Sequence, residues 1–323
     1  MGLKKVVEYI KRNKNFLITT HINMEGDAAG SELAFYRLLK AMGKRATIIN
    51  DDNLSYEYSF LPGINQIKKF KKNLKNIKFD CFVILDCSDL ERCGQIYKIN
   101  TANKPVLNID HHISNQRFGD VNWVEPHSSS VSEMIYQLYK KLDLPLNREI
   151  AMLLYVGILT DTGSFRYPNT TSVTHKIVSQ LLRYNLDIAQ IYKNVYENIP
   201  FQDMKLLSKI LPTISRDANG KIAWFQIQRR ILKNKKISFD LTEHILHFAR
   251  AIKDAEVAVL FKENLGKKNE VRVNLRSQGK VDVNRIASFF GGGGHKTASG
   301  ATVKGKIEDV RKKVLAKIRE SLR

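Results

Sequence analysis

Short apolar runs alternate with amphipathic stretches along the first 185 residues of the chain. The apolar runs are nearly continuous, which is typical of strands in a parallel sheet that is covered on both faces. The amphipathic stretches have helical spacing, and some open with Ser residues that can cap a first turn. We expect strands at 16–20, 46–50, 79–86 and 104–110, and helices at 6–13, 30–43, 129–142, 148–159 and 170–185. This alternation predicts an α/β domain with a doubly wound parallel sheet.

The second half of the chain predicts a smaller α/β domain. Residues 186–210 have a helical pattern of mixed polarity and contain Pro200, which is typical of a connection between two lobes. The remaining pattern predicts strands at 221–228, 256–264 and 270–277, and helices at 239–252, 283–290 and 308–323. We therefore expect a first domain at 1–185, a helical linker at 186–210 and a second domain at 211–323.

The chain is strongly basic. Its 53 Lys and Arg residues against 32 Asp and Glu residues give a formal charge of +21 and an isoelectric point near 9.8. Such a charge favours polyanionic partners, namely nucleic acid or phosphorylated ligands. A general bias toward lysine explains the same total, so both interpretations stay open. The lysine-rich runs 68–78 and 229–236 are expected to be solvated faces that could also steer anions.

The cysteines and the apolar runs predict a reduced, cytoplasmic protein that does not enter a membrane. Cys81, Cys87 and Cys93 form no CxxC pair and lie in or just after an apolar run, which is typical of small buried residues rather than metal ligands. The N-terminal residues lack an apolar signal core. The longest apolar run, 150–159, is shorter than the roughly 20 residues that span a bilayer.

Acidic residues and histidines recur where the predicted strands end. The carboxyl ends of parallel strands share one edge of a sheet, so their side chains can converge on a ligand there. The candidates are His21, Glu25 and Asp27 after the first strand, Asp86 and Asp89 at the third, Asp110, His111 and His112 at the fourth, and Asp161 after the apolar helix. Each one alone could cap a helix or lie in a polar loop. Together they favour a binding site.

Five segments carry a resemblance to a known family. HINMEGDAAGS, LDCSDLERCG, NIDHH and GILTDTGSF resemble the four ordered motifs of the DHH phosphoesterase family. GGGGHKTASG at 291–300 is similar to the signature of its DHHA1 partner domain. The order of the motifs and their spread over the whole chain make the resemblance specific. The chain length resembles the compact bacterial branch of nanoRNases and pAp phosphatases, which includes stand-alone enzymes that hydrolyse pApA, the product of cyclic di-AMP.

The resemblance implies a site for two metal ions, usually Mn²⁺, with Mg²⁺ or Co²⁺ as substitutes. The implied ligands are His21, Glu25 and Asp86 for one ion and Asp27, Asp86, His111 and Asp161 for the other. Carboxylates mixed with imidazoles suit Mn²⁺ better than Ca²⁺ or a structural Zn²⁺. The resemblance also gives His112 a contact with the scissile phosphate or the leaving group, and we expect Asp110 to orient an imidazole.

The glycine-rich segment 291–294 predicts a second binding element. Four glycines alone are more typical of a hinge, but bare backbone N–H groups next to His295 can approach a phosphate or a base closely. In the family, this loop and an Arg-Ser pair on the preceding strand hold the far end of the substrate. The matching residues are Arg276, Ser277, Gly293, Gly294 and His295, with Arg272 as a weaker candidate on the face of Arg276. A substrate that spans both elements is expected to be a di- to pentanucleotide.

One position departs from the family pattern. Where the family has Pro-Asp-x-Asp, this chain has Met24-Glu25-Gly26-Asp27, so the longer Glu25 replaces an aspartate ligand. A displacement of about 1 Å can cost roughly a hundredfold in rate, and we therefore expect a weaker or altered first metal site.

The leading functional hypothesis is a metal-dependent phosphodiesterase. It would release nucleoside 5′-monophosphates from short oligoribonucleotides or pApA, with 3′-dephosphorylation of pAp and hydrolysis of cyclic di-AMP as further candidate activities. The alternatives are a nucleotide- or RNA-binding protein whose metal site Glu25 has crippled, and a pyrophosphatase. The resemblance also suggests a homodimer.

Overall fold

The chain folds into two compact units in the computed structural model, which describes residues 2–71, 77–232 and 241–322. The units are Met1–Asn198 and Ile199–Arg323, so the division lies within the segment 186–210 where we predict a linker. That segment contains α6 (Ile188–Tyr192), a π-helical turn at Lys193–Glu197 and α7 (Phe201–Ile210). The limits of the linker stay a prediction. Parts of both lysine-rich runs and the start of the helix predicted at 239–252 lie outside the described residues.

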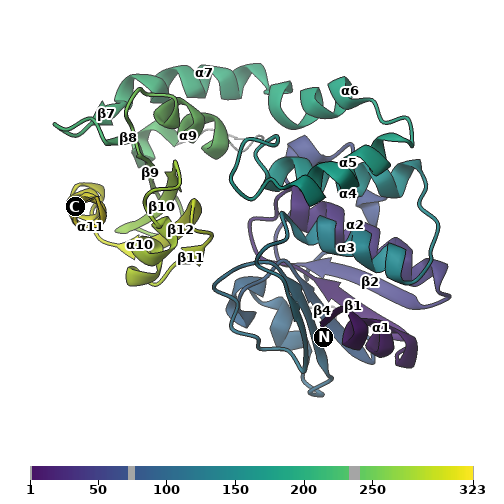
Figure 1. The fold of residues 1–323 in the computed structure, drawn as a ribbon. Coiled ribbons are helices and arrows are strands. Elements are labelled where there is room, and N and C mark those ends of the chain that lie inside the picture. The colour runs from purple at the N-terminus through teal and green to yellow at the C-terminus, as the bar shows by residue number, and fades with distance from the viewer. Residues whose placement is uncertain (1, 72–76, 233–240, 323) are drawn as a thin grey trace. The chain divides into compact units, whose positions relative to one another are not determined.

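The first unit is built on a six-stranded parallel sheet with the strand order β3-β2-β1-β4-β5-β6 (Figure 1). The strands are β1 (Asn15–Thr19), β2 (Arg45–Asn50), β3 (Ile67–Lys69), β4 (Cys81–Leu85), β5 (Val106–Asp110) and β6 (Val121–Val124). The order reverses between β1 and β4, which pair with Leu17 opposite Phe82. In open sheets of this kind, ligands bind beyond the carboxyl ends of the strands at the reversal point. The topology therefore predicts a ligand site at the carboxyl ends of β1 and β4.

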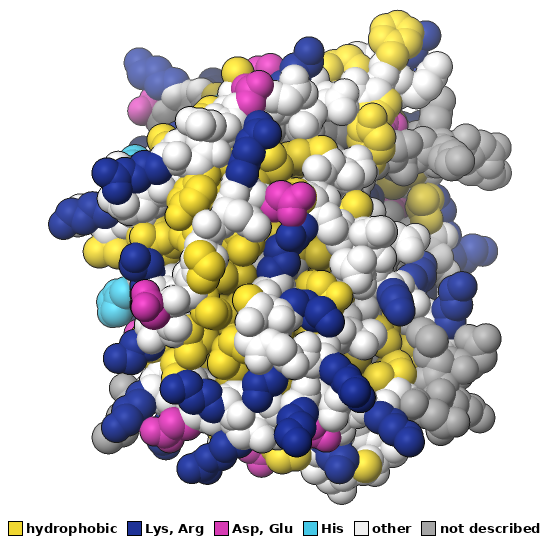
Figure 2. Space-filling view, turned by 90° about the vertical axis from the view of Figure 1, so that its right-hand side faces the viewer, with side chains coloured by type: hydrophobic (Ala, Val, Ile, Leu, Met, Phe, Trp, Pro, Cys, Tyr) yellow, Lys and Arg dark blue, Asp and Glu magenta, His cyan; other side chains and the backbone are white. Residues whose placement is uncertain are grey.

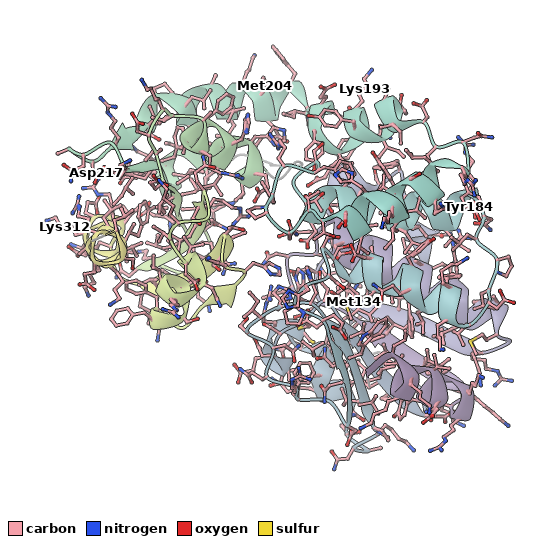
Figure 3. All side chains as sticks on the ribbon, in the orientation of Figure 1. Met134, Tyr184, Lys193, Met204, Asp217 and Lys312 are labelled. Atoms are coloured by element: carbon pink, nitrogen blue, oxygen red, sulfur yellow. The ribbon has the colours of Figure 1, made fainter. Side chains whose placement is uncertain are left out.

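Both faces of this sheet are covered, as the apolar strands predict. Alternate residues point to opposite faces, so Phe16 and Ile18 of β1 join the core below the helices, whereas Leu17 joins a second core. Figure 1 shows the helical layer, and Figure 3 labels Met134, a fully buried residue of α3. The helices of the unit are α1 (Gly2–Arg12), α2 (Gly26–Ala41), α3 (Val131–Lys141), α4 (Arg148–Asp161) and α5 (Ser172–Leu182). The second core is covered by the 3₁₀ turns η3 (Leu90–Cys93) and η4 (Ile96–Ile99).

Helices α2 and α4 approach each other closely because glycines face the contact. A Cβ atom on Gly30 of α2 would overlap the carbonyl oxygen of Leu153 on α4. A Cβ atom on Gly157 of α4 would overlap Ser132 Oγ and lie 2.7 Å from Asp27 Oδ1. Any larger residue at these two positions would push the helices apart. The close packing thus fixes the distance between Asp27, in the first turn of α2, and Asp161, the last residue of α4.

The second unit is a mixed sheet with helices on both faces. Its strand order is β11-β12-β10-β9-β8-β7, in which only the β8–β9 pair is parallel. The strands are β7 (Ser215–Arg216), β8 (Ile222–Ile227), β9 (Val257–Glu263), β10 (Glu270–Ser277), β11 (Gly293–Gly294) and β12 (Ala298–Lys304). One face packs on α10 (Val283–Phe289) and α11 (Ile307–Ser321), and the other packs on α7 and α9 (Thr242–Arg250). The α/β class predicted for both halves is confirmed.

Several elements differ from the prediction. Helix α2 begins at Gly26 rather than at residue 30, because the helix includes the small residues that precede its amphipathic part. Helix α4 runs on to Asp161, so this carboxylate lies in the last turn of the helix and not after it. The strands that sequence reasoning missed, β3, β6, β7, β11 and β12, are short or rich in glycine and small residues. The three cysteines are free and buried, as predicted.

The surface shows how the positive charge is distributed. On the face in Figure 2, Lys and Arg side chains are spread between apolar side chains and do not form one continuous band. The described residues of this face therefore form no single basic track for a long polyanion. Within the described ranges, none of the helices is both long enough and apolar enough to cross a membrane.

A buried polar network joins the strand ends where the sheet order reverses. Asn50 Nδ2 donates to Glu32 Oε2 at 2.7 Å, and Asn50 Oδ1 accepts from Thr19 Oγ1 at 3.0 Å and from the Thr20 backbone at 3.2 Å. Thr20 Oγ1 in turn donates to the carbonyl oxygen of Leu85 at 2.9 Å. Burial raises the pKa of Glu32 to about 8, although the bond from Asn50 opposes this change. Glu32 is therefore largely protonated at neutral pH.

The raised pKa of Glu32 predicts a pH-dependent stability. The folded protein holds the Glu32 proton between the ordinary value of 4.5 and about 8, so its free energy of unfolding falls as the pH rises through that range. Glu32→Gln keeps an acceptor for Asn50 and cannot ionise. Relative to this variant, the wild type should lose more than about 1 kcal/mol of stability from pH 5 to pH 8, since a tenfold change in proton affinity corresponds to about 1.4 kcal/mol. Urea unfolding at each pH measures the difference, with Glu8→Gln on the exposed face of α1 as the control. A constant difference would mean that Glu32 stays charged.

Candidate metal centre

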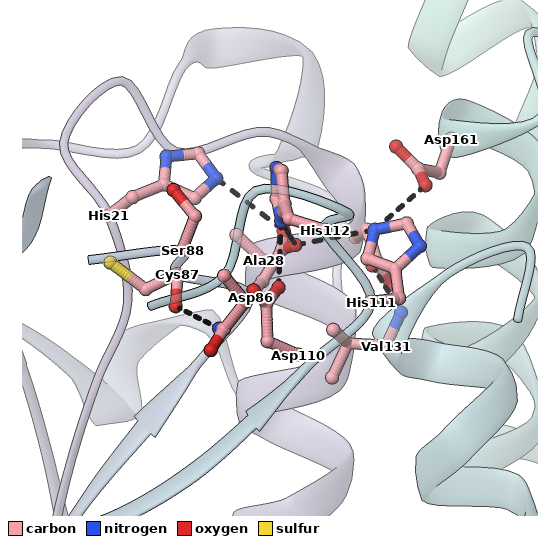
Figure 4. A network of polar contacts seen from close by, with 12 residues as sticks. His21, Ala28, Asp86, Cys87, Ser88, Asp110, His111, His112, Val131 and Asp161 are labelled. Atoms are coloured by element: carbon pink, nitrogen blue, oxygen red, sulfur yellow. Dashed lines mark hydrogen bonds and ion pairs between the residues drawn. The ribbon is translucent and has the colours of Figure 1, made fainter. Parts of the chain in front are cut away.

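The predicted site residues of the first unit gather at the carboxyl ends of β1, β4 and β5. His21 and Asp86 follow β1 and β4, the two strands at which the sheet order reverses. Asp110 is the last residue of β5, and His111 and His112 follow it directly. All five side chains are at least nine-tenths buried. The chain thus brings polar residues from three strand ends to one place (Figure 4).

Asp86 lies at the centre of this cluster. Its Oδ2 is 3.4 Å from His21 Nε2, and its Oδ1 is 3.5 Å from His111 Nε2 and 3.6 Å from His112 Nδ1. Asp161 approaches from α4, with its Oδ2 at 3.2 Å from His111 Nε2. The backbone of Asp86 has a φ of 54°, in the left-handed region that Asp adopts more readily than most residues. The chain therefore turns sharply where β4 delivers this carboxylate.

Two of the histidines are oriented in the same way. His21 Nδ1 lies 2.8 Å from the carbonyl oxygen of Ile22, and His111 Nδ1 lies 3.1 Å from that of Ser128. A carbonyl only accepts, so each Nδ1 carries the proton of the ring. When such a ring is neutral, it offers the lone pair of Nε2, which is the nitrogen that faces Asp86. A backbone carbonyl behind the ring is a common support for a metal-ligating histidine.

His112 has a different environment. Its Nδ1 forms a 2.7 Å bond with Asp110 Oδ1, and the other oxygen of Asp110 accepts from Asn115 Nδ2 at 2.5 Å. Although burial raises the pKa of Asp110, the contacts with His112 outweigh it and hold this pKa well below its usual range. Nε2 of His112 is turned toward Arg92, whose NH1 is 3.4 Å away. Asp110 therefore supports His112 rather than either of the other two rings.

Asp27 is held by the start of another helix. Its Oδ2 accepts from the backbone N–H of Val131 at 2.7 Å, and its Oδ1 accepts from that of Ser132 at 2.8 Å. These groups belong to the first turn of α3, where free N–H groups and the helix dipole favour a negative charge. Burial and the nearby charge of Asp86 nevertheless raise the pKa of Asp27 to about 6.

The cluster holds more negative charge than its histidines can balance. Burial and the charges of Asp27 and Asp86 raise the pKa of Asp161 well above its usual range, although His111 opposes this change. Burial disfavours ionisation of Asp86 too, but its contacts with His111 and His21 outweigh burial and hold its pKa well below the usual range. Like charges that crowd one site separate their pKa values in this way. A bound cation would remove the conflict.

Orphaned oxygen atoms support the same conclusion. Asp86 Oδ1 and Asp161 Oδ2 are buried and, within the described residues, accept no hydrogen bond of good geometry. Ligand atoms of Asp27, Asp86 and His111 lie within 4.8 Å of one another. Buried carboxylate oxygens without donors are costly unless a metal ion or a proton satisfies them. The donor set therefore fits a divalent cation that prefers oxygen with some nitrogen.

Comparisons with known proteins agree with this architecture. A family model described as the DHH family, N-terminal domain, matches residues 15–158, and a model of the DHHA1 domain matches residues 227–322. The chain carries a DHH domain followed by a DHHA1 domain. The resemblance seen in the sequence motifs is thereby confirmed.

Curated relatives match the DHH and DHHA1 domains together. A bifunctional oligoribonuclease and PAP phosphatase NrnA from Thermus thermophilus is 29% identical and is aligned over 99% of this chain and 94% of its own length. The protein of the same name from Bacillus subtilis is 28% identical over 93% of this chain and 92% of its own. Among solved structures, an exopolyphosphatase-related protein from Bacteroides fragilis has a TM-score of 0.85 at 24% identity, covering 98% of this chain and 96% of that one. The likeness to this solved structure shows the fold alone.

Glu25 differs from the buried residues of the cluster in its exposure, although its charge acts on both His21 and Asp161. It occupies the position before α2 and is exposed, and its side chain does not cap the helix. The clusters of potential ligand atoms in the described residues do not include it. Its role as a ligand stays a prediction. Asp89, which the sequence placed among the strand-end acids, caps η3 by accepting the backbone N–H of Arg92 at 3.0 Å.

The predicted binding residues of the DHHA1 domain lie on β10 and around β11. Arg272 and Arg276 share one face of β10, whereas the intervening Val273 and Leu275 are buried in the core. Arg276 pairs with Glu243 of α9. Ser277 is 2% exposed and donates to the carbonyl oxygen of Val281 at 2.7 Å, so in this structure its hydroxyl supports a turn.

The glycine-rich loop of the DHHA1 domain is tightly packed. Gly293 and Gly294 form β11 against β12, and Gly294 has a φ of 139°, a region open to glycine. The backbone of His295 closes the turn by donating to the carbonyl oxygen of Ala298 at 2.7 Å. The substrate contacts of these residues stay a prediction.

Sequence reasoning missed three supporting residues of the DHH domain. Arg92 contacts His112, Asn115 holds Asp110, and Asn169 donates to the carbonyl oxygens of Ser129 at 2.9 Å and Asp161 at 3.1 Å. Arg92 lies inside the motif LDCSDLERCG, and Asn169 lies in a Pro-Asn turn. The local sequence could therefore have pointed to both residues. Asn115 follows the DHH motif without any pattern that points to it.

The ligand geometry predicts that divalent metal stabilises the DHH domain through Asp86. Binding to the folded state alone adds about 2.7 kcal/mol at a metal concentration of 100 times the dissociation constant. Mn²⁺ or Mg²⁺ should therefore raise the melting temperature of the wild type, and Asp86→Asn should lose most of this increase. Thermal unfolding with and without metal measures the effect, and Glu8→Gln, an acid-to-amide change on an exposed face, should behave like the wild type. An equal metal response of Asp86→Asn would contradict the assignment.

Proposed function

We propose that this protein is a metal-dependent phosphoesterase that hydrolyses short oligoribonucleotides or pApA to nucleoside 5′-monophosphates and removes the 3′-phosphate of pAp. The observation that carries the proposal is the buried cluster around Asp86, in which carboxylate oxygens lack donors at the reversal point of the sheet. The names of the curated relatives, oligoribonuclease and PAP phosphatase, support the same substrate class. Hydrolysis of cyclic di-AMP remains a further candidate activity.

The residues of the DHH domain divide into two proposed ligand sets that share Asp86. They are His21, Glu25 and Asp86 for one ion and Asp27, Asp86, His111 and Asp161 for the other. When bound, two divalent ions would activate water and neutralise charge on the phosphate. Mn²⁺ is the proposed ion because oxygen ligands combined with imidazoles suit it. The backbone carbonyls behind His21 and His111 hold both rings in the tautomer that a metal ion needs.

His112 is proposed to act on the substrate. Asp110 fixes its Nδ1, so Nε2 is the atom available to a phosphate oxygen or to the departing oxygen. In this role, Nε2 would donate a proton to the leaving alkoxide. This arrangement would give the leaving nucleoside a proton source that is distinct from the ligand set.

The DHHA1 domain is proposed to bind the far end of the substrate. Arg276 and Arg272 present guanidinium groups on one face of β10, and such groups suit phosphate. The loop that contains Gly293, Gly294 and His295 brings backbone close to a ligand. Homodimer formation and a cytoplasmic location are also proposed, since the family resemblance and the cysteine pattern favour them.

Turnover of pApA tests the function. With Mn²⁺, the wild type should release AMP from pApA, and Asp86→Ala should lower the rate by at least about a thousandfold, because both proposed ion sites lose a shared ligand. Chromatography of the products across pApA, other dinucleotides, pAp, cyclic di-AMP and pyrophosphate measures the preference. The exposed-face variant Glu8→Gln serves as the matched control. Tight binding without turnover would favour the alternative of a binding protein, and activity on pyrophosphate alone would favour a pyrophosphatase.

The replacement at Glu25 gives a separate test. Glu25→Asp restores the ligand length of the family pattern, so we expect it to keep or raise Mn²⁺-dependent activity, whereas Glu25→Ala should lose about tenfold or more in metal affinity or rate. The measurements are the initial rate and the Mn²⁺ concentration for half-maximal activity. Abolished activity in Glu25→Asp, or no effect of Glu25→Ala, would count against Glu25 as a ligand.

A further inference from the structure

The guanidinium group of Arg92 lies at the edge of the buried cluster and faces groups that bind anions. Its NH1 is 3.4 Å from His112 Nε2 and 3.4 Å from Ser88 Oγ. Neither partner is a carboxylate, so these contacts leave the positive charge of the guanidinium unneutralised. A guanidinium offers five N–H donors and no acceptor, and its planar fork matches the oxygens of a phosphate.

The backbone around Arg92 is fixed on both sides. Its N–H donates to Asp89 Oδ1 at 3.0 Å, and its carbonyl oxygen accepts from Ile22 at 2.8 Å, in the loop that follows His21. The next residue, Cys93, is fully buried in the core below the sheet. The position of the guanidinium is therefore tied to the loop that carries a proposed metal ligand. The backbone contacts fix where the side chain begins, and the contacts of NH1 with Ser88 and His112 orient the guanidinium.

His112 lies between Asp86 and Arg92. One ring nitrogen, Nδ1, is 3.6 Å from Asp86 Oδ1, and the other, Nε2, is 3.4 Å from Arg92 NH1. A phosphate beside Nε2 would therefore have the carboxylate cluster on one side and the guanidinium on the other. Arg92 places a cationic group here, and Ser88 Oγ accepts from its NH1 at 3.4 Å while donating to Asp89 Oδ2 at 3.3 Å.

We propose, on the basis of the proposed function, that Arg92 donates to a non-bridging oxygen of the phosphate that is hydrolysed. During hydrolysis, the bond from phosphorus to water oxygen forms, and the bond from phosphorus to the leaving oxygen breaks. Arg92 transfers no proton. It balances the negative charge that spreads over the non-bridging oxygens, which is the stage at which a preorganised donor accelerates the reaction.

The test compares Arg92→Ala and Arg92→Lys with Arg45→Ala. Arg45 is exposed at the first position of β2, at the opposite end of the strands from the cluster. Its replacement by alanine removes one positive charge, as Arg92→Ala does. With pApA and Mn²⁺, Arg92→Ala should lose about a hundredfold in kcat/KM, mainly in kcat, because the contact strengthens in the transition state. Arg92→Lys should keep part of the rate, since it retains the charge without the fork. Free guanidinium ion should partly restore Arg92→Ala and leave Asp86→Ala unchanged.

Two measurements without turnover separate this role from a structural one. Calorimetric binding of inorganic phosphate to the metal-loaded protein should weaken about tenfold in Arg92→Ala, as expected for one lost charge-assisted hydrogen bond. The metal-induced increase in melting temperature should stay as in the wild type. Wild-type kinetics and phosphate affinity in Arg92→Ala would overturn the proposal, and so would loss of its metal response, because Arg92 would then only support the fold.

The same experiment keeps the two proposals apart. In one outcome, the wild type hydrolyses none of the nucleotide substrates, and Arg92→Ala binds phosphate more weakly than the wild type. The proposed function then fails, and Arg92 stands as a phosphate-binding residue. If the wild type hydrolyses pApA and Arg92→Ala matches Arg45→Ala in every measurement, the function stands and the role of Arg92 fails.

Discussion

The DHH domain depends on holding several carboxylates together in a buried place. Asp86 has imidazole nitrogens of three histidines within 3.6 Å, and Asp27 and Asp161 lie close enough to influence one another's ionisation. Buried like charges repel strongly because little water screens them. Hydrogen bonds and contacts with histidines offset this repulsion, although the carboxylates lie close together. The contacts gather the carboxylates at the point where a doubly wound sheet normally binds its ligand.

Helix packing supplies much of this support. The first turn of α3 gives two backbone N–H groups to Asp27, and α2 and α4 meet across Gly30 and Gly157. Since Asp27 begins one of these helices and Asp161 ends the other, the glycine contact sets how far apart the two carboxylates lie. The apolar character of α4 all round its surface follows from its position between other helices. The two glycines therefore determine the spacing of the carboxylates as well as the packing of the core.

The sequence predicted four of the six strands of the parallel sheet, because their apolar runs follow simple periodic rules. It also placed acids and histidines at the ends of these strands, and their role as metal ligands stays a prediction. It placed Asp27 and Asp161 outside the helices that in fact contain them, since helix ends depend on tertiary contacts such as those of Gly26 and Asn169. Arg92 and Asn115 were missed for another reason. Their roles come from contacts with His112 and Asp110, and side-chain pairs across loops leave no periodic signal.

The adjacent histidines of the DHH motif show how one strand end can serve two tasks. Successive residues of an extended chain point in different directions. His111 therefore faces Asp86 and Asp161 with its Nε2 while a carbonyl holds its Nδ1, and His112 turns its Nε2 away from the carboxylates toward Arg92. Asp110 holds Nδ1 of His112, so Nε2 is the ring nitrogen that faces Arg92. The carboxylates and the cationic group of Arg92 thus meet around one short segment, residues 110–112, so a cation held by the former and an anion held by the latter would lie on either side of His112.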